Sequence, residues 1–311
     1  MINEPKQHHF IPQCYLRGFL SNNVKKQTIT VIDLNQRKSF GSNIRNVGGK
    51  RYFNKAKIEG KDTCELESIL SKVEDIIIKG LKQIEKDQNL SNEESNNIIF
   101  NLMAIIVARN PNTRLNLVNF QKQITQHFLK IMVSNKDTYE NLKKRSKITD
   151  DLPYDQMKEF IQSDRHRIEV PNECCIPLEF KSIDVILPLL SKRGWELAIS
   201  SEKTGPFVTS DYPVVLNWKH PEKIPLFNRA HPGFGMPDTT VQFPISKHLA
   251  LTGEFEFTDK VHFADINYVS DFNRKTIRFA SPQVYAPDLN FYFKNDIGQM
   301  CFGADYFKDW F

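Results

Sequence analysis

The sequence predicts an α+β protein with a helical middle and β elements at its N-terminal and C-terminal ends. An alternating, β-branched run near the start favours strands, as does alternation in the last third, whereas apolar residues recur with a helical period between them. A chain of 311 residues can bury a large core as one big domain or two coupled ones. We expect one large domain over residues 1–311, with an N-terminal arm and β segment (1–61), a helical part (62–165) and a mixed, β-rich part (166–311).

The composition is that of an ordinary soluble globular protein. The net charge of +5 and the pI near 8.8 permit an anionic partner without demanding one. The first residues hold no apolar signal region, and the most apolar run, 98–108, is shorter than the ~20 residues of a membrane helix. We therefore expect a cytoplasmic protein with no membrane partner, while the oligomeric state is left open.

The five cysteines indicate a reducing compartment, because their number is odd and no signal region precedes them. No CxxC pair occurs. Cys174 and Cys175 are adjacent, which suits neither an ordinary disulfide nor a zinc knuckle. We interpret them as structural thiols.

Residues 8–20 open with two adjacent histidines, a residue type that suits proton transfer and metal ligation. Neighbouring side chains face different directions on a strand or a helix, so we expect one of His8 and His9 to face a site while the other packs or holds a backbone group. Pro12 favours an extended residue before it. A short helical turn would follow, with Gly18 relieving local crowding.

Arg17 would project from that turn, where its guanidinium could clamp a carboxylate or a phosphate. The alternative is an N-terminal arm tied into the core, with Arg17 in a structural ion pair. The apolar residues of this stretch need a partner that the polar residues 21–27 do not supply. We therefore expect the stretch to pack against the C-terminal strands.

Residues 28–34 predict a strand, and residues 37–40 predict its returning partner. From 37 to 61 the charges are almost all positive, and Tyr52 and Phe53 are interleaved with them. Such a composition is typical of a nucleic-acid-binding surface, but it is found more often in a solvated loop. Both interpretations remain open.

Helical periodicity predicts helices over residues 66–77, 91–108, 115–132 and 153–161. The second opens with a capping-box pattern at Ser91 and is apolar nearly all round, so its middle must be enclosed. Arg109 and Asn110 precede Pro111, which ends or kinks it. The charged residues 143–151 are expected to form an exposed connection.

The C-terminal third predicts strands at 195–200, 207–216, 239–243 and 248–257, the second of them interrupted by a tight turn. A short helix is expected at 183–190 and another at 263–279, with a Pro- and Gly-rich loop at 217–238. In the turn, Ser210 or Asp211 can bond local backbone groups. This structural interpretation competes with a catalytic one.

Several short motifs along the chain resemble those of the DUF4238 family, a group of uncharacterised, mostly bacterial proteins. The opening motif is His-His-x-x-Pro-x-x-Tyr-Leu-Arg-x-Phe from His8, and Asn267 is expected to precede a final helix. The others lie at residues 66–67, 109–111, 195–197, 207–214 and 243–246. The chain departs from the family pattern at Tyr212, where asparagine is typical, and at Gly194. The resemblance implies no established reaction.

The first functional hypothesis is a phosphodiesterase- or nuclease-type hydrolase acting on nucleic acid or a nucleotide. His8 or His9 would be the general base or a metal ligand, and Asp211 a ligand or an orienting group. Arg17 and Arg109 would clamp phosphate.

Two further site arrangements can be assembled without diagnostic spacing. Ser210, His8 and Asp211 could form a Ser/His/Asp set, and a divalent metal could bind His8 or His9 with Asp211 and a loop histidine. No P-loop, GxGxxG, HExxH, GxSxG or zinc-ribbon pattern is present.

The second hypothesis is a non-catalytic sensor or protein-interaction module, in which the same polar motifs are structural. The positions of the polar side chains in the fold distinguish the two hypotheses. A single cleft that held His8, Arg17, Arg109 and Asp211 would favour the enzyme, and side chains each paired within its own turn would favour the module.

Overall fold

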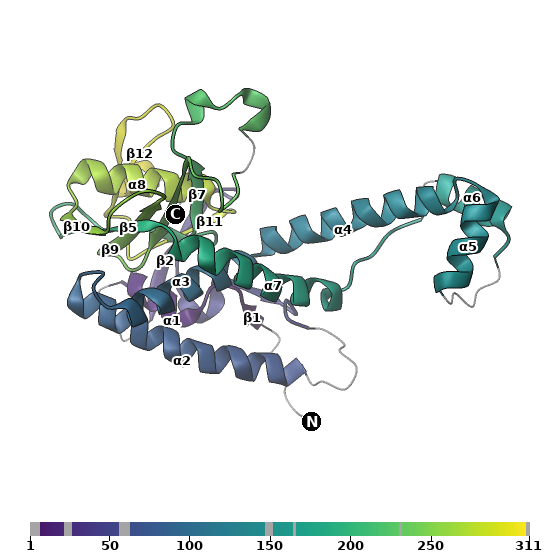
Figure 1. Ribbon diagram of the computed structural model, residues 1–311. Helices are drawn as coiled ribbons and strands as arrows, with labels where there is room; N and C mark the ends of the chain where they lie inside the picture. Colours follow the sequence, from purple (N-terminus) through teal and green to yellow (C-terminus); the bar gives the residue numbers. More distant parts are fainter. Residues whose placement is uncertain are drawn as a thin grey trace. The chain divides into compact units, whose positions relative to one another are not determined.

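The computed structural model describes residues 7–21, 27–55, 63–146, 152–163, 166–229 and 232–308 (Figure 1). A run of helices in the middle of the chain is flanked by strands on both sides, and the predicted α+β class is confirmed. The chain divides into two compact units. Unit 1 comprises Met1–Asn110 and Glu179–Phe311, and unit 2 comprises Pro111–Leu178.

A five-stranded sheet lies in unit 1. Its neighbouring strands are antiparallel, except that the edge strand β10 runs parallel to β5. The strands expected at 195–200, 239–243 and 248–257 are confirmed, whereas β10 was not predicted. The order across the sheet is β10 (Lys260–Phe263), β5 (Gly194–Ile199), β9 (Leu249–Glu254), β8 (Thr239–Pro244) and β7 (Val215–Trp218).

A four-stranded antiparallel sheet joins the two ends of unit 1. The N-terminal hairpin is confirmed, and its inner strand pairs with a late strand that also pairs with the Thr209–Ser210 strand. The two halves of the stretch 207–216 therefore enter different sheets. The order is β3 (Lys38–Asn43), β2 (Thr28–Asp33), β11 (Gln283–Ala286) and β6 (Thr209–Ser210).

Two small antiparallel pairs complete the β structure of the described residues. β1 (Gln7–His9) pairs with β4 (Gly49–Arg51), and β12 (Tyr292–Lys294) pairs with β13 (Met300–Phe302). None of these four three-residue strands was predicted, because so short a segment shows no alternation. The first pair carries both N-terminal histidines.

Helices of unit 1 cover both faces of the five-stranded sheet (Figure 1). Alternate residues of β5 divide between the two faces. Trp195 and Leu197 join the core formed with α2 and α3, and Ala198 packs with α8. The helices are α1 (Gln13–Leu16), η1 (Arg17–Phe19), η3 (Ile44–Asn46), α2 (Thr63–Asp87), α3 (Glu93–Ala108), η4 (Pro221–Lys223), η5 (Leu226–Asn228), α8 (Ile266–Phe279) and α9 (Gly303–Tyr306).

The residues that cap the N-termini of α3 and α8 differ from those predicted. The side chain of Asn92, rather than that of Ser91, caps α3 by accepting a hydrogen bond from the Ser95 amide at 3.0 Å. Asp265 caps α8 in the same way, so Asn267 lies inside that helix instead of preceding it. The middle of α3 is enclosed as predicted, and the helix ends just before Pro111.

Unit 2 contains α4 (Pro111–Met132), α5 (Lys136–Ser146), α6 (Tyr154–Gln162) and the start of α7 (Asn172–Ser191). The expected connection at 143–151 is wrong for its first residues, because α5 continues through them. Tyr139 explains the helix, since it is buried against Met132 and Ile161. Residues 147–151 lie outside the described residues. α7 is longer than predicted and accommodates Pro188 near its end.

The N-terminal stretch packs against the C-terminal strands, as predicted. Tyr15 is fully buried, and its hydroxyl donates to the Pro244 carbonyl at 2.7 Å and lies 2.7 Å from the Thr209 hydroxyl. Its ring stacks on Phe243 at a centroid distance of 5.1 Å. Since an aromatic side chain buries a large apolar area, this contact ties the first residues to the core. Among the described residues, no helix is long and apolar enough to span a membrane.

Candidate functional site

His8 and His9 face opposite sides of β1, as the alternation of a strand requires. His8 is buried opposite Lys50 of β4, and its Nδ1 accepts a hydrogen bond from the Asn54 amide at 2.7 Å. The ring therefore holds the backbone turn that follows β4. Because Nδ1 accepts, the proton of the neutral ring lies on Nε2.

Asn54 connects His8 to the end of α3. Its side-chain oxygen accepts a hydrogen bond from Arg109 Nη2 at 3.1 Å, and both side chains are at least nine-tenths buried. A buried guanidinium needs partners of this kind, because desolvation without hydrogen bonds is costly. His8 and Arg109 are thus brought together through a residue that lies between them in space but was not predicted.

His9 is half-buried and donates from Nδ1 to the Val47 carbonyl at 3.1 Å. This hydrogen bond fixes the Nδ1–H tautomer of the neutral ring, which leaves Nε2 as an acceptor. His9 and Arg109 both line a pocket of about 180 Å³, together with Glu74 of α2. The remaining polar lining is Gln7, Gln13 and Ser71.

Ser210 and Asp211 form a hydrogen-bonded turn. The Ser210 hydroxyl is fully buried and accepts from the Tyr212 amide at 3.1 Å. The two carboxylate oxygens of Asp211 accept from the Ser281 amide at 2.5 Å and from the Gln283 amide at 3.1 Å. Both side chains thus bond backbone groups, which is what a turn-forming role requires.

Burial raises the pKa of the Asp211 carboxyl from 3.8 to about 6. The amides of Ser281 and Gln283 oppose this rise, whereas the nearby Asp33 carboxylate adds to it. The Asp211 carbonyl also accepts from the Asn110 side chain at 2.8 Å. Since Asn110 follows Arg109 directly, the Asp211 turn is joined to the same end of α3 that serves the His9 pocket.

Arg17 lies in a different groove. It is exposed on η1 and lines a hollow of about 330 Å³ with Ser246, Lys247 and His248. None of the residues that line this groove also lines the His9 pocket. The structure therefore brings together His8, His9 and Arg109, joins Asp211 to them through Asn110, and leaves Arg17 apart.

The positively charged segment 37–61 contributes to the core as well as to the surface. Phe53 is buried and packs against Phe10, with ring centroids 6.1 Å apart. Tyr52 is exposed, with the guanidinium of Arg51 and the ammonium of Lys55 near its ring. Residues 56–62 of this segment lie outside the described residues.

No group of three His, Cys, Asp or Glu side chains in the described ranges is placed to hold a metal ion. Of the loop histidines, His220 lies 3.4 Å from Glu222, and His231 is outside those ranges. Cys14, Cys174, Cys175 and Cys301 are free thiols.

Sequence reasoning missed Asn54, Glu74 and Asn110. Only Asn110 carried a signal, because it stands between Arg109 and Pro111 at a predicted helix end. Asn54 and Glu74 acquire their places from contacts between segments distant in the sequence.

Comparison with known proteins gives a family. The model of the family described as "Protein of unknown function (DUF4238)" matches residues 7–289, a range that includes all of unit 2 and most of unit 1. Searches of curated proteins and of solved structures found no match. Because the family match covers most of the 311 residues, the chain belongs to the DUF4238 family.

Proposed function

We propose that the protein is a phosphodiesterase- or nuclease-type hydrolase acting on nucleic acid or a nucleotide, with its reaction in the pocket lined by His9, Glu74 and Arg109. The observation that carries the proposal is the hydrogen bond from His9 Nδ1 to the Val47 carbonyl beside a buried arginine. A backbone carbonyl that orients an imidazole sets the direction of its other nitrogen, as a general base requires.

The other lining groups suit a phosphodiester. The Arg109 guanidinium offers planar, paired donors that match phosphate oxygens. Glu74 is a carboxyl group in the same pocket and supplies the second acid–base group that hydrolysis of an ester needs. A volume of about 180 Å³ accommodates the phosphoryl group and its immediate neighbours, so the rest of the substrate would extend outside.

In this proposal His8, Ser210 and Asp211 are positioning residues. Each bonds a backbone amide, and together they hold the β1–β4 pair and the Asp211 turn against the end of α3. Catalysis depends on such supporting contacts because small displacements of reacting groups are costly.

The second candidate is a non-catalytic sensor or interaction module. It is favoured by the hydrogen bonds of Ser210 and Asp211. The Ser210 hydroxyl and the Asp211 carboxylate both accept from backbone amides, as structural side chains in a turn do. Rigidly framed polar motifs of this kind also serve purely to specify a fold.

Hydrolysis of bis(4-nitrophenyl) phosphate and of a labelled single-stranded oligonucleotide, each with and without Mg²⁺ or Mn²⁺, tests the proposal. His9→Ala should lower the rate by about 100-fold or more without changing the melting temperature. His220→Ala, a histidine in an exposed loop, is the matched control and should retain the wild-type rate. Absence of turnover by the wild type on both substrates, or full activity of His9→Ala, would exclude the pocket and leave the module.

Asp211→Ala separates positioning from chemistry. It orphans two backbone amides and should lower the free energy of unfolding by about 1–3 kcal/mol. Activity per folded molecule should then fall much less than in His9→Ala, because Asp211 supports the pocket without touching the substrate. Loss of activity with unchanged stability would instead give Asp211 a direct part in the reaction.

A further inference from the structure

A second groove of unit 1 has no part in the proposed hydrolysis. Its hollow of about 330 Å³ lies between η1, the C-terminal part of α2 and the turn between β8 and β9. The charged and polar residues that line it are Arg17, Glu85, Gln88, Ser246, Lys247 and His248. Two motifs singled out in the sequence, those at residues 8–19 and 243–246, meet here.

A backbone hydrogen bond joins the two segments that carry the cations of the groove. The Lys247 amide donates to the Gly18 carbonyl at 2.9 Å, which couples the segment of Arg17 to that of Lys247. Gly18 allows this approach, since a Cβ there would lie 3.0 Å from Ser246 Cβ and 3.1 Å from the Ile245 carbonyl. Like charges repel one another unless an anion lies between them.

The Arg17 guanidinium has no hydrogen bond or ion pair with any residue that the structure describes. The carboxyl group of Glu85 lines the same groove and that of Glu202 lies near His248, but neither pairs with Arg17. Burial raises the pKa of Glu85, against the effect of the Ser246 hydroxyl, and Glu202 is 93% exposed. The donors of the guanidinium therefore remain available to a ligand.

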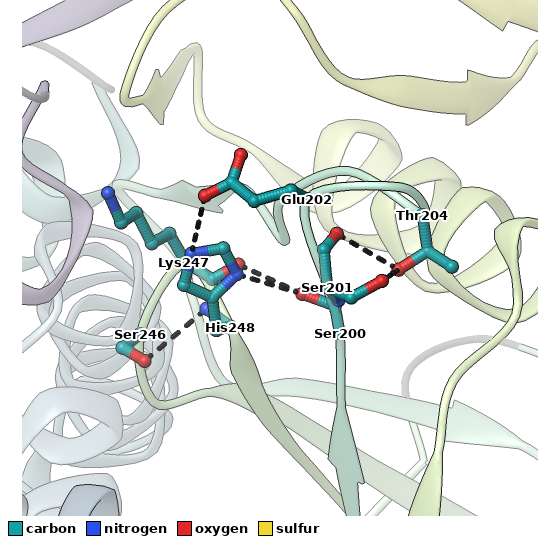
Figure 2. Close-up of polar contacts among 7 residues, drawn as sticks. All are labelled: Ser200, Ser201, Glu202, Thr204, Ser246, Lys247 and His248. Atoms are coloured by element: carbon teal, nitrogen blue, oxygen red, sulfur yellow. Dashed lines mark hydrogen bonds and ion pairs between the residues drawn. The ribbon is translucent and has the colours of Figure 1, made fainter.

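The His248 ring is oriented toward the loop that follows β5, as Figure 2 shows. Its Nδ1 lies 3.3 Å from the Ser200 hydroxyl, and its Nε2 lies 3.9 Å from Glu202. Burial and the charge of Lys247 lower the pKa of His248, against the effect of Glu202, and so favour the neutral ring in the unliganded protein. An anion in the groove would favour the charged ring and draw a proton onto it.

We propose that this groove binds a small molecule through a phosphate monoester group, with Arg17 and Lys247 as the charged clamp and Ser246 and His248 as further partners. Two cations, a hydroxyl and an imidazole provide more donors than one carboxylate can use, whereas a dianionic phosphate presents three acceptor oxygens. The inference is independent of the proposed hydrolysis, because the two pockets share no lining residue.

Calorimetric titration with inorganic phosphate tests this site, with sodium acetate as the carboxylate comparison. Arg17→Gln and Lys247→Gln should each weaken phosphate binding by about tenfold or more, the effect of losing one charged hydrogen bond. Lys192→Gln, an exposed lysine elsewhere in unit 1, should bind like the wild type. Arg17 is exposed, so Arg17→Gln decides the test even if Lys247→Gln fails to fold.

Sulfate supplies a second readout, because it stays dianionic between pH 6 and 8. The groups that face His248 are Arg17, Glu85, Lys247 and Glu202. Sulfate binding should strengthen as the pH falls from 8 to 6 in the wild type, and His248→Gln should reduce this dependence, whereas Glu85→Gln should leave most of it in place.

Three results would overturn the proposal. They are no binding of phosphate by the wild type at millimolar concentration, acetate binding as tight as phosphate binding, or a loss of phosphate binding in His9→Ala with none in Arg17→Gln. The last result would place the anion in the His9 pocket and would leave the hydrolase proposal standing.

Discussion

Asp211 shows how a single buried side chain can connect three segments. Its carboxylate accepts from amides on either side of Pro282, and its carbonyl accepts from the side chain of Asn110. The turn after β6 is thereby held to β11 and to the end of α3. Hydrogen bonds to buried amides matter most when they are removed, because the amides are then left without water or protein partners.

The raised pKa of Asp211 predicts a pH dependence of stability. The folded protein holds a proton up to about pH 6 that the unfolded chain releases near 3.8. This stabilising contribution is fully present below the lower value and is lost as the pH rises through about 6. In urea unfolding, the contribution of Asp211 to the free energy of unfolding should therefore be about 1 kcal/mol larger at pH 5 than at pH 7.

Asp211→Asn isolates that contribution, because it removes the titrating group and leaves every other one in place. The change in unfolding free energy between pH 5 and 7 should differ between the two proteins by about 1 kcal/mol. Opposing groups such as His248, whose pKa is lowered, act equally in both proteins and cancel. Identical pH dependence in the two proteins would show that Asp211 does not bind the proton.

At the scale of elements, the contact between η1 and the β8–β9 turn depends on a missing side chain. Gly18 lies against Ser246 and Ile245 at distances that leave no room for a methyl group. Tyr15, one turn earlier, bonds the neighbouring Pro244 carbonyl. The N-terminal helical turn and the sheet are therefore matched in shape as well as in polarity.

Gly18→Ala should lower the free energy of unfolding by about 1–3 kcal/mol, because the added methyl group must displace a packed strand end. Gly41→Ala is the matched control. A Cβ at Gly41 meets nothing within 4 Å, and the residue is exposed on β3. Chemical denaturation of both variants measures the difference, and equal stabilities would mean that η1 does not press on the turn.

For the whole molecule, the first residues behave as part of the core. The amides of Phe10 and Ile11 both donate to the Gly48 carbonyl, and those of Tyr15 and Leu16 donate to the Pro12 carbonyl. Tyr15 and Leu16 are fully buried. A terminal stretch with such contacts is coupled to global unfolding rather than to local fraying.

Hydrogen exchange should therefore find the amides at residues 10, 11, 15 and 16 protected to nearly the same degree as those of α3. Residues 136–145 of α5, whose charged side chains are mostly exposed, provide an internal reference with weaker protection. Exchange of the N-terminal amides within seconds in the intact protein would contradict a docked arm.

The local sequence determined the elements that carry a clear period. The β-branched run at 28–33, the apolar helix before Pro111 and the strands β5, β8 and β9 of the large sheet all appear where their periods placed them. The packing of the N-terminal aromatic residues against the C-terminal strands was also predicted, because the polar residues next to them offer no apolar partner. Period and capping act through neighbours within a turn or a strand, so they can be read without the fold.

Only the tertiary structure decided which polar residues meet. His9 and Arg109 share a pocket with Glu74 because β1, α2 and the end of α3 come together, whereas Arg17 faces another groove. The strands β1, β4 and β10 are too short to show a period, and α5 is stabilised by burial of Tyr139. Contacts between segments distant in the sequence set these outcomes, and no local pattern encodes which distant residue will be the partner.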